Sequence, residues 1–480
     1  MLEGMEDIVK KMPPLNLLDH VAHDADRLRV VAEFKRLDDL WRLDAAFREA
    51  YRLDPEKALA DTGLSIEPEA FRLYRNRDEL ENLLCDIREG RRGADALPES
   101  LLLYYRALWE RVQKHKQMQE VRLVPDEPRM QTWRARQDRR LRLQLGRGTA
   151  DSMIKPPVAF ELSDGCSVGC PFCGIAAKGL RGIFRYTGEN AAMWRETLSR
   201  IHALMGDAAG YGICYYATEP LDNPDYEMFL EDWYREFGFA PLTTTAASTR
   251  DLERMRALLR FNDEKGHYFY RLSILSPAMR DTLLAAFTPE ELLRAILLPQ
   301  FPEAPGNIFT KAGRNRDQNR KDAVGSTISC VNGFVVNMQE KTVRLETPFV
   351  SDKDHPTGEW FLEKCAFTTA EDLETQMRRM IARYMPENLS LSRPCGASCD
   401  FRLEEKDGRV EVSSRGGSLV LLQDAMEQAA LDTLRDALRE RRYTGRELLD
   451  LLPEGTDTMM SFLLLNMLWY HGLVDQTAEE

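Results

Sequence analysis

Short apolar runs alternate with helical stretches between about residues 155 and 345, and this alternation limits the fold more than any other feature. Short apolar runs bounded by turn residues predict strands, and helical stretches between them predict crossover connections, so parallel strands are expected. The pattern is typical of an α/β fold containing a partial (β/α)6 barrel. The predicted strands span 157–162, 211–217, 241–246 and 269–275, and the predicted helices span 190–206, 225–236, 250–261 and 289–297.

The segments on either side of this region have a different pattern. The chain before it is predicted to be all-helical, because Phe34, Leu37 and Trp41 recur at helical spacing and Asp54-Pro55 has the residues of a helix start. The chain after it is predicted to be mixed and mostly helical, and the spacing of its last helices also resembles a degenerate winged-helix or peptide-recognition module. We expect a helical N-terminal domain with a basic linker (1–150), the barrel (151–345), a post-barrel extension (346–418) and a C-terminal helical bundle (419–480).

Charge and composition narrow the classes of partner. The formal net charge of −13 argues against nucleic acid as the main partner. No stretch approaches the apolar length that a membrane helix needs, so no membrane partner is expected either. The nine cysteines are typical of a protein in a reducing compartment. We therefore expect a cytoplasmic protein.

One stretch, 129–147, is strongly basic in this acidic chain, with Asp138 as its single acid. It is either a solvated helix face or a surface that docks an acidic peptide. Nucleic acid is a weaker interpretation, because Trp133 is the single aromatic side chain available for stacking. Its arginines are Arg129, Arg134, Arg136, Arg139, Arg140, Arg142 and Arg147.

The first predicted strand is followed by a cysteine loop, Cys166-Ser-Val-Gly-Cys170-Pro-Phe-Cys173. Three thiolates at this spacing can ligate three irons of a [4Fe-4S] cluster, because thiolate sulfur is the usual ligand of such clusters. A zinc site is the alternative interpretation, but zinc motifs usually pair two C-x2-C knuckles and the chain shows no second knuckle. The third interpretation is that the cysteines are buried core thiols.

This loop resembles the cluster loop of radical S-adenosylmethionine (SAM) enzymes. The resemblance implies a [4Fe-4S] cluster on Cys166, Cys170 and Cys173, with SAM on the fourth iron, and an external electron donor. Catalytic groups of such barrels lie at the carboxyl ends of strands, where Cys166 and Glu219 are expected. The resemblance also implies that Phe172 packs near the adenine and that Thr218 and Glu219 bind the ammonium group of SAM. Ser248 could bond the ribose or carboxylate of SAM, and Arg271 or Ser273 could do likewise; the alternative is that each is a plain polar residue at a strand end.

Within that superfamily the chain is most similar to maturases of ribosomally made peptides. Phe160 to Gly174, Ala217 to Tyr226 and Val331 to Met338 carry the similarity, and Asp54 to Leu64 is similar to a Nif11-type leader. The closest resemblance is to peptide epimerases that act on proteusin-type precursors. It implies a precursor peptide with a leader as substrate, and hydrogen abstraction by a 5′-deoxyadenosyl radical followed by L-to-D inversion at Cα.

An epimerase also needs a thiol that returns hydrogen, and here the chain departs from the pattern. Related maturases often carry a cysteine after the Thr-Pro pair, where this chain has Phe349. Cys330, Cys395 and Cys399 are the candidate donors. If none serves, the resemblance implies a splicease that excises a tyramine unit with a small accessory protein, or a cross-linking enzyme. A peptide-binding protein with a structural cluster and no turnover is the alternative from another class.

Overall fold

The computed structural model describes residues 4–17, 24–307, 310–316 and 330–476. The chain divides into two compact units, each built from two separate stretches. Unit 1 comprises Met1–Val121 and Glu219–Phe309, and unit 2 comprises Arg122–Thr218 and Thr310–Glu480. The fold is mixed α/β, as predicted. The division into four consecutive segments stays a prediction.

The N-terminal part of unit 1 is helical, as its apolar spacing predicts. Aspartates start several of its helices: the Asp54 carboxylate accepts a hydrogen bond from the Lys57 amide at 3.0 Å. Stacked rings of Phe34 and Tyr104, with centroids 4.6 Å apart, join α2 to α7 in the core. The helices are α1 (Met5–Val9), α2 (Ala25–Leu43), α3 (Ala45–Leu53), α4 (Pro55–Ala60), α5 (Pro68–Arg75), α6 (Arg77–Arg88), η1 (Ala94–Ala96) and α7 (Glu99–Gln117), and η2 (Met118–Arg122) follows.

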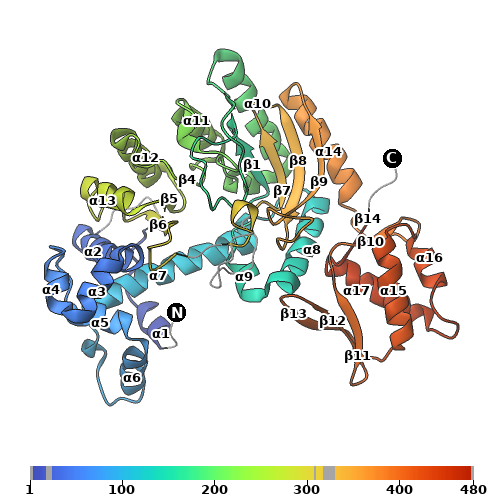
Figure 1. Cartoon of the computed structure of the whole chain (residues 1–480), viewed down its shortest axis with the longest axis horizontal. Coiled ribbons are helices and arrows are strands. Elements are labelled where there is room, and N and C mark those ends of the chain that lie inside the picture. The colour runs from blue at the N-terminus through green and yellow to red at the C-terminus, as the bar shows by residue number, and fades with distance from the viewer. Residues whose placement is uncertain (1–3, 18–23, 308–309, 317–329, 477–480) are drawn as a thin grey trace. The chain divides into compact units, whose positions relative to one another are not determined.

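The second part of unit 1 contains a parallel sheet of order β4-β5-β6 with a helix in each crossover (Figure 1). Alternate residues of β5 and β6 are buried, so one face of the sheet packs on the core and the other is half open. The elements are η4 (Pro220–Asp222), α11 (Tyr226–Phe237), β4 (Thr244–Thr245), α12 (Leu252–Lys265), β5 (Tyr270–Ile274), α13 (Pro277–Ala286) and β6 (Ala295–Pro299).

Unit 2 is built on a four-stranded sheet of order β1-β7-β8-β9, in which β1 and β7 are parallel and the other pairs antiparallel. Phe160 of β1 packs edge-on against Trp194 of α10, and α10 packs beside α14 (Figure 1). Its first stretch comprises α8 (Pro128–Leu145), α9 (Arg147–Ser152), β1 (Val158–Glu161), β2 (Ser163–Asp164), β3 (Gly182–Ile183), α10 (Gly188–Met205) and η3 (Gly206–Tyr211). Its second begins with η5 (Gly313–Asn315), β7 (Gly333–Asn337), β8 (Thr342–Pro348), β9 (Glu359–Ala366) and α14 (Ala370–Tyr384).

The C-terminal part of unit 2 combines an antiparallel sheet of order β11-β12-β13 with helices and a β10-β14 pair. Leucines of α15 and α17 form its core with Val410 and Val412 of β12. Its elements are β10 (Cys395–Ala397), β11 (Arg402–Lys406), β12 (Arg409–Ser414), β13 (Gly417–Leu422), α15 (Gln428–Glu440), α16 (Gly445–Asp450), α17 (Thr458–Tyr470) and β14 (Val474–Gln476).

Three predicted elements differ from the observed ones. The predicted strand 211–217 is reduced to one parallel bridge, between Ile213 and Ala159. The predicted helix 289–297 is wrong, because its end is strand β6, which pairs along its length with β5. The predicted strand 241–246 is confirmed at Thr244–Thr245 alone. Among the described residues the strands form separate sheets, and a continuous barrel stays a prediction.

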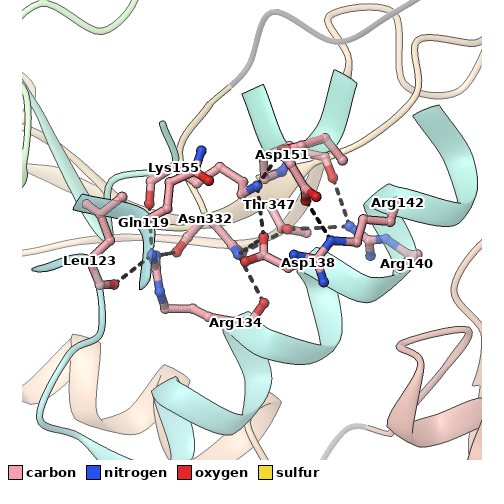
Figure 2. Close-up of polar contacts among 12 residues, drawn as sticks. Gln119, Leu123, Arg134, Asp138, Arg140, Arg142, Asp151, Lys155, Asn332 and Thr347 are labelled. Atoms are coloured by element: carbon pink, nitrogen blue, oxygen red, sulfur yellow. Dashed lines mark hydrogen bonds and ion pairs between the residues drawn. The ribbon is translucent and has the colours of Figure 1, made fainter. Parts of the chain in front are cut away.

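The prediction that the basic stretch forms a solvated or peptide-docking face is wrong for its central arginines. Arg134, Arg136 and Arg140 of α8 are buried. They bond to other parts of unit 2. Figure 2 shows that Arg134 donates to the carbonyls of Leu123, Lys155 and Asn332 and that Arg140 donates to the Thr347 hydroxyl at 3.4 Å. Arg140 also donates to the Pro348 carbonyl at 2.8 Å. These side chains hold the unit together, because each buried guanidinium donates hydrogen bonds to carbonyl groups outside α8.

Candidate functional site

The cysteine loop follows directly on β1, at the carboxyl end of a strand, as predicted. The short pair β2–β3 closes the base of the loop, and the Cys166 amide donates to the Lys178 carbonyl at 2.9 Å. Gly165 adopts a φ of 88°, and a side chain there would collide with the backbone of Gly179. The loop is thus folded back tightly on itself, and glycine is required at its entry.

A second segment holds the loop from outside. The backbone amide of Arg314 donates to the Cys173 carbonyl at 3.0 Å, and its guanidinium donates to the Cys170 carbonyl at 2.8 Å and to the Ala177 carbonyl. Gly313, at a φ of 55°, approaches Cys173 too closely to allow a side chain. Sequence reasoning missed both residues, because they are distant in sequence from the loop and form no motif with it.

The donor set of the loop fits an iron–sulfur cluster in its chemistry. Cys166, Cys170 and Cys173 are all half-buried, and none forms a disulfide. Thiolates are the ligands that such clusters take. In the part of the chain that the structure describes, however, no three His, Cys, Asp or Glu side chains are gathered closely enough to hold a metal ion. The ligand role of the three cysteines therefore stays a prediction. Phe172 lies half-buried within the same loop.

The second motif spans the boundary of the two units. Ala217 and Thr218 end a stretch of unit 2, and Glu219 begins a stretch of unit 1. Ala217 has a φ of 52°, a left-handed conformation that glycine adopts at no steric cost. The Thr218 amide donates to the Tyr215 carbonyl at 3.4 Å.

Glu219 is buried and already serves as a structural acceptor. Its carboxylate accepts hydrogen bonds from the Leu221 amide at 3.1 Å, from the Thr245 hydroxyl at 2.5 Å and from the Ala246 amide at 2.8 Å. These bonds tie the motif to β4. Burial raises the pKa of Glu219 above its ordinary value, although the three hydrogen bonds oppose that shift. An ionised carboxylate has about four acceptor sites, so one remains for a ligand. Its role toward SAM stays a prediction.

The two candidate serines lie on the same sheet of unit 1. Ser248 follows β4 and is fully buried, and its hydroxyl has no hydrogen-bond partner among the described residues. An orphaned hydroxyl at the carboxyl end of a strand fits a site that takes a polar ligand group. Ser273 lies on β5 with Arg271, on the half-open face of the sheet.

The candidate hydrogen donors lie in different settings. Cys395 is fully buried in the C-terminal core, where the Gln476 amide donates to its sulfur at 3.0 Å, and burial raises its pKa to about 11. Cys399 packs against the same core, and burial raises its pKa to about 12. Cys330 is half-buried just before β7. The setting of Cys395 is that of a packed structural thiol, and the donor role of all three stays a prediction.

One face of the sheet in unit 2 carries a charged network that the sequence did not reveal. Arg344 of β8 donates to Glu346 at 2.7 Å and to Glu161 of β1 at 2.9 Å, and Asn337 of β7 donates to Glu161 at 2.8 Å. Glu346 is fully buried, and burial raises its pKa to about 7. The network therefore links the strand that carries the cysteine loop to its neighbours through β8.

Comparison with known proteins gives one clear relative. No protein-family model matches the chain. The crystal structure of BtrN in complex with AdoMet and 2-DOIA aligns with 39% of this chain and 72% of its own at 14% identity, but its TM-score of 0.28 is too low to support any argument about fold or function.

The relative is the uncharacterized protein y4wI of Sinorhizobium fredii (strain NBRC 101917 / NGR234). The two sequences are 33% identical over 368 residues, which cover 74% of this chain and 70% of the relative. Identity at that level over most of both proteins indicates common descent and a shared fold. No helix in the described ranges is both long enough and apolar enough to cross a membrane. The chain belongs to the family of the uncharacterized protein y4wI.

Proposed function

We propose that this chain is a radical SAM enzyme that modifies a ribosomally made peptide, with L-to-D epimerisation as the leading reaction. The observation that carries the proposal is the cysteine loop, which offers three half-buried thiols at the carboxyl end of β1. The orphaned Ser248 hydroxyl supports it, because Ser248 is one of the residues expected to contact SAM.

The residues of this chain would have distinct tasks. The cluster would be held by Cys166, Cys170 and Cys173. The hydrogen bonds from Arg314 to the Cys170 and Cys173 carbonyls, which we call the Arg314 clamp, would fix the loop that carries these thiols. Ser248 would receive a polar group of SAM. When bound, the cluster and SAM together supply a 5′-deoxyadenosyl radical, which can abstract hydrogen from a peptide. The residues around the loop would keep solvent away from that chemistry.

The first test is anaerobic SAM cleavage by the full-length chain after cluster reconstitution, read as 5′-deoxyadenosine formed. Cys170→Ala should abolish cleavage, because a cluster needs all three thiolates. Cys85→Ala is the matched control, since Cys85 lies on α6 outside the loop, and it should cleave SAM normally. Normal turnover by Cys170→Ala would refute the proposal. Cluster binding without any cleavage in the wild type would instead favour a peptide-binding protein.

Splicing is the second candidate reaction, and the packing of Cys395 favours it. Phe349 stands where related maturases carry a donor cysteine, and Cys395 is buried in the C-terminal core. A reaction that returns no hydrogen from a thiol needs neither a cysteine at position 349 nor Cys395 as a hydrogen donor. Reaction in deuterium oxide with a precursor peptide encoded beside the gene separates the two by mass spectrometry. Solvent deuterium gained at the modified residue supports epimerisation, and loss of a backbone fragment supports splicing.

A further inference from the structure

Unit 1 contains a cavity of about 210 Å³ between its helical part and its sheet. Tyr74 of α5 and Tyr104 of α7 line it together with Leu17 from the segment after α1, and Phe269 and Ile296 line it from the sheet region. Phe269 directly precedes β5 and Ile296 lies near the start of β6, so the cavity is at the amino-terminal end of these strands. Ser273 lies toward the opposite end of β5. The cavity is therefore a separate site from the predicted SAM contacts.

A second cavity, of about 370 Å³, adjoins the first along α7. The two share Leu17, Arg111 and Phe269 as lining residues. Ligand pockets in proteins usually measure at least about 300 Å³, so the first cavity alone suits a single side chain or a small molecule. With the second it suits an extended ligand of several groups. Trp109 adds an apolar wall to the second cavity.

One of the three cations that line the first cavity has no ion-pair partner among the described residues. Lys35, Arg42 and Arg111 line it against Asp38 and Asp39. Asp39 pairs with Lys35 at 2.6 Å and with Arg42 at 3.8 Å. Asp38 pairs with Arg75 at 3.5 Å and accepts a hydrogen bond from Tyr104 at 3.3 Å.

Arg111 has no such partner. Across the described ranges its guanidinium forms no hydrogen bond or ion pair, and its one ring contact is Phe269, with the centroid 5.9 Å away. An arginine fork in a half-buried cavity favours a planar anion that can accept two parallel hydrogen bonds. A carboxylate is such a planar anion.

We propose that Arg111 binds a carboxylate that is attached to an apolar group. The two adjoining cavities would hold the apolar groups beside that carboxylate. An acidic side chain flanked by apolar residues of a peptide has this chemistry, and so does a free carboxylic acid with an aromatic or aliphatic body. The site does not depend on the radical chemistry proposed above, because it lies at the opposite end of the strands from the predicted SAM contacts. A binding measurement tests it without any catalytic turnover.

Isothermal titration calorimetry on the full-length chain tests the proposal with three probes. These are acetyl-Leu-Glu-Leu-amide, its neutral counterpart acetyl-Leu-Gln-Leu-amide, and 3-phenylpropionate. The glutamate peptide or 3-phenylpropionate should bind, and the glutamate peptide should bind at least about tenfold more tightly than the glutamine peptide. Binding of 3-phenylpropionate alone would support the carboxylate site and identify a free acid as its ligand.

Variants of Arg111 link the binding to this side chain. Arg111→Gln should remove the preference for carboxylate, and Arg111→Lys should retain part of it, because lysine keeps the charge but loses the fork. Arg111→Gln should also fold normally, since the guanidinium has no partner to lose. Arg52→Gln is the matched control, because the Arg52 side chain is exposed on α3, and it should bind the probes with the affinity of the wild type. Equal affinity for the two peptides without binding of 3-phenylpropionate, or unchanged carboxylate binding by Arg111→Gln, would overturn the proposal.

Discussion

At the scale of single residues, Gly313 is the tightest contact on the cysteine loop. Its φ of 55° disfavours any side chain, and a methyl group there would collide with the carbonyl oxygens of Cys173 and Gly174. The loop would have to shift, and with it the thiols that we assign to the cluster. Neighbouring Arg314 donates to loop carbonyls and would lose those contacts in the same movement.

Gly313→Ala should therefore lower the free energy of unfolding by more than about 1 kcal/mol, because left-handed strain and the collision add together. Iron bound after reconstitution should fall as well. Gly455→Ala is the control: Gly455 has a φ of 89° and nothing within 4 Å of an added methyl, so it carries the strain without the collision. Thermal unfolding and iron content measure both effects. Equal losses of stability and of bound iron in the two variants would show that the contact of Gly313 with the cysteine loop has no special role.

Residue-level prediction succeeded where a single stretch carries the whole pattern. Asp54 accepts from the Lys57 amide as an N-cap, at the predicted helix start. The cysteine loop is at a strand end for the same reason. Gly313 and Arg111 could not be found, because their roles come from contacts with residues that are remote in sequence and leave no local pattern.

At the scale of elements, α8 shows how charge alone can mislead. Its arginines fall in a basic stretch that predicts an exposed surface, yet Arg136 is fully buried. The Arg136 guanidinium donates to the carbonyls of Trp469 and Val474, each at 2.8 Å, and pairs with Asp475. The helix is anchored to the C-terminal strand β14 by a side chain that sequence patterns assign to solvent.

Arg136→Ala should lower the free energy of unfolding by about 3 kcal/mol or more, because it removes the guanidinium hydrogen bonds to two carbonyls and the buried ion pair with Asp475. Arg147→Ala, at the exposed start of α9, removes the same charge and should leave the unfolding midpoint unchanged. Chemical denaturation followed by circular dichroism measures both. If both variants are equally stable, the buried contacts of Arg136 contribute nothing.

The secondary-structure predictions failed where a short apolar run is compatible with a helix and with a strand. The run from Ala295 to Pro299 has no periodicity of its own, and its pairing with β5 makes it a strand. The apolar pair Leu421 and Leu422 likewise belongs to a strand, because it completes β13, and α15 begins at Gln428. Long amphipathic helices such as α12 and α14 involve no such choice.

At the scale of the whole molecule, the two units contain buried groups with opposite responses to pH. In unit 2 burial raises the pKa of Glu346 from 4.5 to about 7, so the native state holds a proton that the unfolded state has lost, and stability falls as pH rises through that window. In unit 1 burial lowers the pKa of His267 from 6.5 to about 4, so the unfolded state takes up a proton first. Stability then falls as pH drops through that window.

Calorimetric unfolding of the full-length chain between about pH 4 and pH 8 should therefore show two transitions with opposite pH trends. Glu346→Gln should flatten the trend of one transition and His267→Gln that of the other, because each removes the titrating group of its unit. Glu404→Gln, an exposed control on β11, should alter neither. If both buried variants change the same transition, the units do not unfold independently.

The interleaving of the two units also sets the order in which the chain can fold on the ribosome. The helices before Val121 complete their unit when residues 219–309 have been made, and the other unit waits for the final residues. At about 5–20 residues per second, each half-built unit exposes its apolar faces for many seconds. We therefore expect heterologous expression to depend on chaperones and slow translation, and expect fragments cut at any single position to be insoluble.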